Sequence, residues 1–195
     1  MPSRIQRVNE TLTQGHEELQ SASSQISITL IDGTLTTFRP VVLEDVRLLA
    51  KAGITNEIEA AGRLIVRNCI KWADKPGITL PQLRSRDIED IELISETLSP
   101  THIPEFVELP DRSKSLTLGS GTEVTFRRPN YGDAEAISKN KDGDLEAQVA
   151  IALRLCIKWG ERDGVDQATL NKLNMGDWQG VSKLLESFRS KRQSD

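Results

Sequence analysis

Aromatic and metal-binding side chains are scarce in this chain. Of its 195 residues 4% are aromatic, two are cysteines and two are histidines. His16 and His102 each lack a second histidine or a cysteine at ligand spacing, so we expect no metal site. The cysteines form no Cys-x-x-Cys pair, which excludes the redox and zinc motifs built on that spacing.

Phosphate-binding and nucleophile motifs are missing as well. The chain contains neither a Gly-rich phosphate loop nor a Gly-x-Ser-x-Gly elbow. Its acidic clusters, such as the one at 87–90, fall at predicted helix starts, where the helix dipole and solvation account for them. We assign no catalytic residue and no cofactor, and we predict that the protein is not an enzyme.

A basic excess and a long hydrophobic run are also absent. Lys and Arg number 25 against 29 Asp and Glu, a net charge of −4, so nothing favours nucleic acid as a partner. No apolar run approaches the roughly 20 residues of a membrane span, and residues 1–24 contain no apolar core of a signal peptide. We therefore expect a cytosolic protein with reduced thiols.

What the sequence does contain is an internal repeat. The tetrapeptide Cys-Ile-Lys-Trp occurs at 69–72 and again at 156–159, and the stretch 28–39 returns in similar form at 116–127. A repeat of this length indicates tandem structural modules. Each copy has roughly 75 residues, near the lower limit for an adequate core, so we expect the modules to pack on each other or on another chain.

Each copy predicts a β-hairpin followed by three helices, which makes the fold class α+β. Residues 26–39 alternate apolar and polar side chains around an Asp-Gly turn, the pattern of a hairpin. Helices are expected at about 44–51, 56–73 and 87–98, and the long one carries an apolar stripe that ends in Cys69 and Trp72. The last helices align best with Asp87 on Asp177 and Ile91 on Val181.

The predicted organisation assigns the rest of the chain to an arm, a connector and a tail. The arm shows no apolar period, so we expect it to bind a partner and to add little to the fold. The connector contains three prolines and several apolar residues, which favours an extended segment lying along a groove of one repeat. The ranges are 1–25 for the arm, 26–98 for module 1, 99–114 for the connector, 115–190 for module 2 and 191–195 for the tail.

Residues shared by the copies are the candidates for function. Arg39 and Arg127 both close a hairpin, and Arg67 and Arg154 both lie two residues before the cysteine. Either the stems of these arginines cover the helix stripe, or each arginine meets an acid on a neighbouring subunit. Trp72 and Trp159 either cap a core or anchor an interface. Both cysteines are predicted to be buried and unpaired. The predicted partner contacts are Arg39, Arg127, Trp72, Trp159 and Phe106.

The order of short motifs resembles a known family. The motifs are Phe38-Arg39-Pro40, Leu43-Glu44-Asp45, Asn68-Cys69-Ile70, and Leu80-Pro81-Gln82-Leu83 before Asp87-Ile88. In this order they resemble the baseplate hub assembly proteins of T-even-like contractile-tailed phages, and they are similar to the short tail-assembly proteins encoded near tape-measure genes. The resemblance covers 26 to about 98 and is more diffuse over 116–188, where Leu155 replaces the asparagine. The chain departs from the family's pattern because it contains two copies of the module and an arm, where a single copy is expected.

The resemblance implies a non-enzymatic structural or assembly protein of a contractile tail, as a baseplate hub component. Its partners would be other tail or baseplate proteins, in a homo- or hetero-oligomer, and it would occur in the host cytoplasm during assembly and in the virion tail or baseplate. One alternative is a tail-assembly chaperone absent from the mature particle, and another is a component of a phage-derived injection system. A small-ligand or nucleic-acid regulator is disfavoured by the charge and the few aromatics.

Overall fold

The computed structural model describes residues 25–138 and 144–190, and the arm and tail predicted at the chain ends lie outside these ranges, except for residue 25. The described chain is an α+β protein with two antiparallel sheets, which confirms the predicted fold class. It divides into two compact units. Unit 1 contains the chain up to Pro40 and Ala61–Leu98, and unit 2 contains Val41–Ala60 and the chain from Ser99. Residues 41–60, predicted within module 1, thus group with unit 2.

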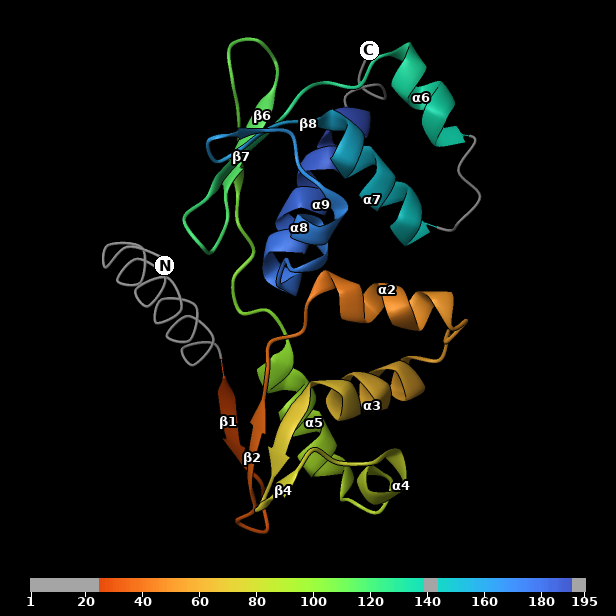
Figure 1. The fold of residues 1–195 in the computed structure, drawn as a ribbon, viewed down its shortest axis with the longest axis vertical. Coiled ribbons are helices and arrows are strands. Elements are labelled where there is room, and N and C mark those ends of the chain that lie inside the picture. Colours follow the sequence, from red (N-terminus) through yellow and green to blue (C-terminus); the bar gives the residue numbers. More distant parts are fainter. Residues whose placement is uncertain (1–24, 139–143, 191–195) are drawn as a thin grey trace, which may run out of the picture. The chain divides into compact units, whose positions relative to one another are not determined.

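Unit 1 is a four-stranded antiparallel sheet with helices packed on one face (Figure 1). The order β1-β2-β3-β4 follows the chain, so every connection joins neighbouring strands. The small core between sheet and helices centres on Phe38, Ile65 and Ile94, each of which is almost fully buried. The strands are β1 (Ile26–Thr29), β2 (Leu35–Phe38), β3 (Cys69–Trp72) and β4 (Lys75–Pro76), and the helices are α3 (Glu57–Asn68, in this unit from Ala61), α4 (Leu80–Leu83) and α5 (Ile88–Leu98).

Unit 2 repeats this plan with one additional strand, β5, on the edge of its sheet (Figure 1). Its core is larger and centres on Phe126, Leu155 and Trp178. The strands are β5 (Phe106–Glu108), β6 (Lys114–Thr117), β7 (Glu123–Phe126), β8 (Cys156–Trp159) and β9 (Arg162–Asp163). The helices are α2 (Leu43–Lys51), α6 (Tyr131–Ser138), α7 (Asp144–Leu155), α8 (Gln167–Asn171) and α9 (Met175–Ser190).

The repeated Cys-Ile-Lys-Trp is a strand in both units, so the prediction that it ends the long helix is wrong. The helices α3 and α7 stop at Asn68 and Leu155, and the next residue begins β3 or β8. A register shift in the pairing of β2 with β3 leaves Ile70 as an extra residue. This bulge turns Cys69 and Trp72 toward the same face at a spacing of three, which imitates the spacing of a helix.

The last helices also align differently from the prediction. Asp90 accepts a hydrogen bond from the backbone N of Ile31 (3.0 Å), and Asp177 accepts one from the equivalent Gly119 N (2.7 Å). Asp90 is therefore the counterpart of Asp177, whereas the sequence alignment used Asp87. Each carboxylate ties the start of the last helix to the hairpin turn of its own unit, and it is buried there. The order of apolar residues favours Asp87, because a contact between distant segments leaves no signal in the local sequence.

The connector predicted at 99–114 belongs to unit 2. Its middle forms β5, which pairs with β6, and its last residue already belongs to β6. The preceding segment crosses α9 at two glycines. A Cβ on Gly176 would lie 2.3 Å from the carbonyl oxygen of His102, and one on Gly180 would lie 3.0 Å from that of Pro104. These glycines let the backbone approach the helix more closely than any side chain allows.

The β3–β4 turn of unit 1 and the equivalent β8–β9 turn of unit 2 offer a test of backbone strain. Ala73 has a φ of 52° in unit 1, and Gly160 has 58° in the same turn of unit 2. Ala73→Gly is expected to raise the free energy of unfolding by about 0.5–1 kcal/mol, because glycine adopts this conformation without a steric penalty. Gly160→Ala is expected to lower it by at least about 1 kcal/mol. Urea unfolding measures both changes, and two changes of the same sign would contradict the assignment.

Candidate functional site

Asp133, a buried carboxylate in unit 2, binds the side chains of Arg127 and Arg154. Asp133 is fully buried and accepts from Arg127 Nη1 (2.6 Å) and Nη2 (3.0 Å) and from Arg154 Nε (2.5 Å). It also accepts from the backbone N of Asn130 (2.8 Å), which caps α6. The Arg127 guanidinium, together with these other bonds, holds the pKa of Asp133 well below its usual range, against the opposing effect of burial.

This cluster shows where the shared arginine of unit 2 lies. The Arg127 side chain is 35% exposed, and its guanidinium is bound by an acid of its own unit. That arrangement favours the structural interpretation over a contact with a neighbouring subunit. Arg39, its counterpart, closes the β1–β2 hairpin, with its backbone N bonded to the carbonyl oxygen of Asn68 (2.9 Å). The assignment of either arginine to a partner contact stays a prediction.

The aromatic candidates all lie in or against a core. Trp72 and Trp159 are 7% and 6% exposed and occupy equivalent positions at the ends of β3 and β8. Phe106 on β5 packs against the core of unit 2, with the Lys114 ammonium 4.9 Å from its ring centre. A core role accounts for all three positions, and Trp72 additionally lines a cavity, described below.

Sequence reasoning missed a second buried charge cluster in unit 2. Arg47 of α2 is buried and meets Glu146 of α7 through Nε (2.8 Å) and Nη2 (2.6 Å), a two-pronged ion pair. Its Nη1 also bonds to the side-chain oxygen of Asn171. The pair raises the pKa of Arg47 and lowers that of Glu146, in each case through the hydrogen bonds between them. This contact fixes α2 on α7 and α8.

The cysteines are unpaired, as predicted, but only Cys156 is buried. Cys69 is half-buried on β3. Burial raises the pKa of both thiols to about 11. In each, a hydrogen bond with the backbone two residues on opposes the rise.

We expect both thiols to react slowly with a maleimide at pH 8. Because so little thiolate is present, labelling of the native chain should be at least about tenfold slower than labelling in urea. Cys156 should be slower than Cys69, since it is more deeply buried. Mass spectrometry of labelling time courses gives both rates, and native rates that match those in urea would refute the burial.

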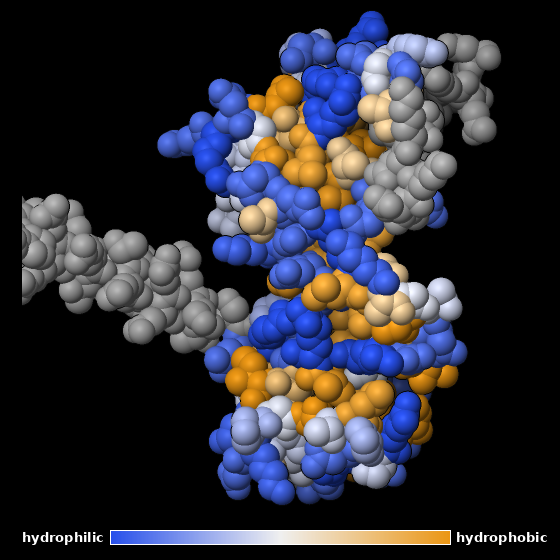
Figure 2. All heavy atoms as spheres, turned by 45° about the vertical axis from the view of Figure 1, so that its right-hand side comes forward, coloured by the Kyte–Doolittle hydropathy of each residue, from blue (hydrophilic) through white to orange (hydrophobic). Residues whose placement is uncertain are grey.

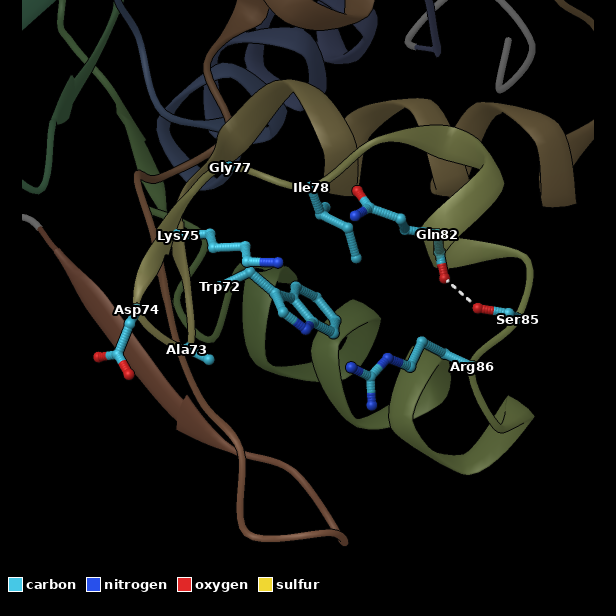
Figure 3. A pocket seen from close by; sticks show the side chains of 9 residues that line it. All are labelled: Trp72, Ala73, Asp74, Lys75, Gly77, Ile78, Gln82, Ser85 and Arg86. Atoms are coloured by element: carbon cyan, nitrogen blue, oxygen red, sulfur yellow. Dashed lines mark hydrogen bonds between the residues drawn. The ribbon is translucent and has the colours of Figure 1, made fainter.

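A cavity opens beside Trp72 in unit 1 (Figure 3). It has a volume of about 440 Å³ and lies between the β3–β4 turn, α4 and the segment that follows α4. Trp72 forms one wall, and the guanidinium of Arg86 lies 5.2 Å from the centre of its ring. Arg86 also donates from Nη1 to Asp32 at 2.7 Å, which holds the guanidinium in place.

The outer edge of β1 is the least protected sheet edge in the described chain. β4 and β9 have only two residues each, and β5 lies between Pro104 and Pro110 and carries Glu108. Such short strands, prolines and charges are the usual protection of an edge. β1 has the uncharged sequence Ile-Ser-Ile-Thr and no proline. In unit 2 the matching strand, β6, is covered by β5.

The register shows which groups point outward from β1. Leu30 N donates to the carbonyl oxygen of Thr34 (2.9 Å). Hydrogen-bonded and non-bonded pairs alternate along an antiparallel ladder, so the backbone groups of Ile28 and Ile26 also face β2. The backbone N–H and C=O groups of Ser27 and Thr29 therefore face away from β2. Ser115, the counterpart of Ser27 in unit 2, pairs with Val107 of β5.

Other kinds of site find no support in residues 25–138 and 144–190. Within these ranges no group of three or more His, Cys, Asp or Glu side chains is placed to hold a metal ion. No helix there is long and apolar enough to cross a membrane. Hydrophobic side chains do reach the surface on the face drawn in Figure 2. Over unit 1 as a whole, the most exposed large hydrophobic residues are Ile31, Leu35 and Ile88, which are 63%, 56% and 65% exposed.

Comparison of the chain with protein-family models, curated proteins and solved structures finds no significant match.

Proposed function

We propose that this chain is a non-enzymatic structural or assembly protein of a contractile phage tail, acting as a baseplate hub component. The observation that carries the proposal is the outer edge of β1, which no strand of the described chain covers. Such an edge suits a protein that joins others through its backbone. The order of motifs resembles the hub assembly family, and this resemblance indicates a contractile phage tail as the assembly. Two similar modules in one chain suit a ring in which neighbouring positions are nearly equivalent.

The mechanism is the addition of an extended partner strand to β1. The outward N–H and C=O groups of Ser27 and Thr29 would bond to that strand, as Ser115 pairs with Val107 within unit 2. Side chains of the added strand on the same face as Ile28 would extend the apolar face of the sheet. The partner is therefore a tail or baseplate protein with an extended segment of alternating apolar and polar residues.

The proposal is tested by following the chain into particles. Mass spectrometry of purified tails from the native source is expected to detect it at a fixed ratio to the other hub proteins. Detection only in tail precursors would favour the chaperone alternative. Absence from both fractions would contradict the proposal.

A matched pair of variants tests the edge itself. Ser27→Pro removes the outward N–H at a position where an edge strand tolerates proline, so incorporation into tails should fall at least about tenfold. Ser27→Val keeps the N–H and should incorporate normally. Equal incorporation of the two variants would rule out strand addition at β1.

A further inference from the structure

We propose that the cavity beside Trp72 in unit 1 binds a carboxylate, presented by an Asp or Glu side chain of a partner protein. The inference rests on the proposed function, because it takes the ligand to be part of another protein. It adds a second contact, separate from the β1 edge, and it assigns a chemical class to the group that is bound.

Positive charge gathers at this cavity from two elements. Lys75 comes from β4, and Arg86 follows α4; Figure 3 shows both side chains reaching toward the space beside Trp72. Lys75 forms no ion pair within the described chain. Asp74 also lines the cavity, but in Figure 3 its carboxylate is turned away from Trp72 and Arg86. That side chain is fully exposed and lies 4.0 Å from the Lys71 ammonium. Asp32 engages only Nη1 of Arg86, so Nε and Nη2 are left as donors.

The neutral groups at the cavity also favour an acceptor as the ligand. The side-chain oxygen of Gln82 accepts from Thr79 N (3.0 Å) and Thr79 Oγ1 (2.7 Å). That fixes the orientation of the amide and leaves its NH₂ group as the available donor. Ser85 uses its hydroxyl hydrogen on the carbonyl oxygen of Gln82 (2.8 Å). Apart from the exposed Asp74, the side chains at the cavity thus offer mainly donors, and two of them are cationic, which matches a carboxylate.

The shape of the cavity indicates a side chain of a larger partner. Sites for free small molecules are mostly apolar and enclose most of their ligand. Here the clearly apolar lining is limited to Trp72, Ala73 and Ile78, and the Arg86 side chain is 31% exposed. A carboxylate that enters on a protein side chain needs less enclosure, because the partner's own surface covers the remainder.

Unit 2 provides an internal comparison. The position of Arg86 is occupied there by Leu173, which is buried with 7% of its surface exposed. One of the two cations is therefore replaced by a core residue, while Arg162 stands in place of Lys75. The shared fold does not require Arg86, and the carboxylate site belongs to unit 1 alone.

The test is a ¹H–¹⁵N NMR titration of the full chain with Ac-Gly-Glu-Gly-NH₂, its Gln counterpart and acetate as probes. The Glu peptide should shift the backbone amides of 75–78 and Arg86 with a millimolar Kd, and the Gln peptide should bind at least about tenfold more weakly. Arg86→Leu, which installs the residue of unit 2, and Lys75→Gln should each weaken the Glu peptide at least about fivefold. Arg162→Gln in unit 2 should leave its affinity unchanged.

Three results would overturn the site. They are equal binding of the Glu and Gln peptides, unchanged affinity in Arg86→Leu, and acetate binding as tightly as the Glu peptide. The last would identify a free small carboxylate as the ligand in place of a protein side chain. Loss of tail incorporation in Ser27→Pro, with no peptide binding here, would reject this site and leave the proposed function standing.

Discussion

Replacing Arg47 by alanine is expected to lower the free energy of unfolding of unit 2 by about 3–5 kcal/mol. The Arg47 side chain is 6% exposed and its partner Glu146 is 17% exposed, so removing the cation leaves a largely buried carboxylate without its two-pronged partner. The Asn171 side-chain oxygen loses its donor as well. Urea unfolding followed by circular dichroism measures the change, and a loss of less than about 1 kcal/mol would contradict the buried ion pair.

Lys51 provides the matched control on the same helix. Its ammonium lies 3.9 Å from the carboxylate of Glu146, but its side chain is 58% exposed. Exposed pairs of this kind contribute between zero and about 1 kcal/mol, so Lys51→Ala should have a small effect. A large effect in both variants would show that α2 is sensitive to any substitution, and the interpretation of Arg47 would then fail.

Replacing Asp133 by asparagine is expected to cost about 2–4 kcal/mol at pH 7. The carboxylate is fully buried, while the two arginine side chains are 35% and 48% exposed, so we expect a loss slightly below that of a fully buried pair. Asparagine keeps the shape of the side chain but removes the charge that Arg127 and Arg154 share. Thermal and urea unfolding both give the difference, with Glu161→Gln, in the exposed β8–β9 turn, as a neutral control.

The dependence on pH identifies the cause of this loss. Because the folded pKa of Asp133 is lowered, its contribution is complete above the unfolded pKa of about 3.9 and decreases as pH falls toward the folded pKa. The difference between the native chain and Asp133→Asn should therefore be constant from pH 7 to about 5 and should shrink below pH 4. A difference that stays the same at pH 3 would point to packing and not to charge.

The hairpins were predictable because their signals are local. Alternating side chains and the turn glycine in residues 26–39 are enough to specify two strands, and Gly33 does adopt a positive φ of 82°. The strand at 69–72 was not predictable in this way. Its bulge places two buried side chains three residues apart, and without knowledge of the pairing partner this spacing is the same as that of a helix.

Arg47 and Arg86 do not stand out in the sequence, because a comparison of the two copies selects only residues that both copies contain. Arg47 has Glu135 at the matching position, and Arg86 has Leu173, so neither appears among the shared residues. Their partners are also distant in sequence: Glu146 lies 99 positions after Arg47. Arg127 and Arg154 were singled out because both copies contain them. Their common partner Asp133 matches Asp45 of module 1 and falls at a helix start, where the helix dipole alone accounts for an acid.

Hydrogen exchange at Ser27 tests the central claim most directly, namely that β1 is the edge on which a partner strand assembles. In the isolated chain the Ser27 amide should exchange quickly, while Ser115, its counterpart paired with β5, should be protected. In assembled tails Ser27 should become as protected as Ser115. A Ser27 amide that is already protected in the isolated chain, or that still exchanges quickly in the assembled particle, would contradict the account.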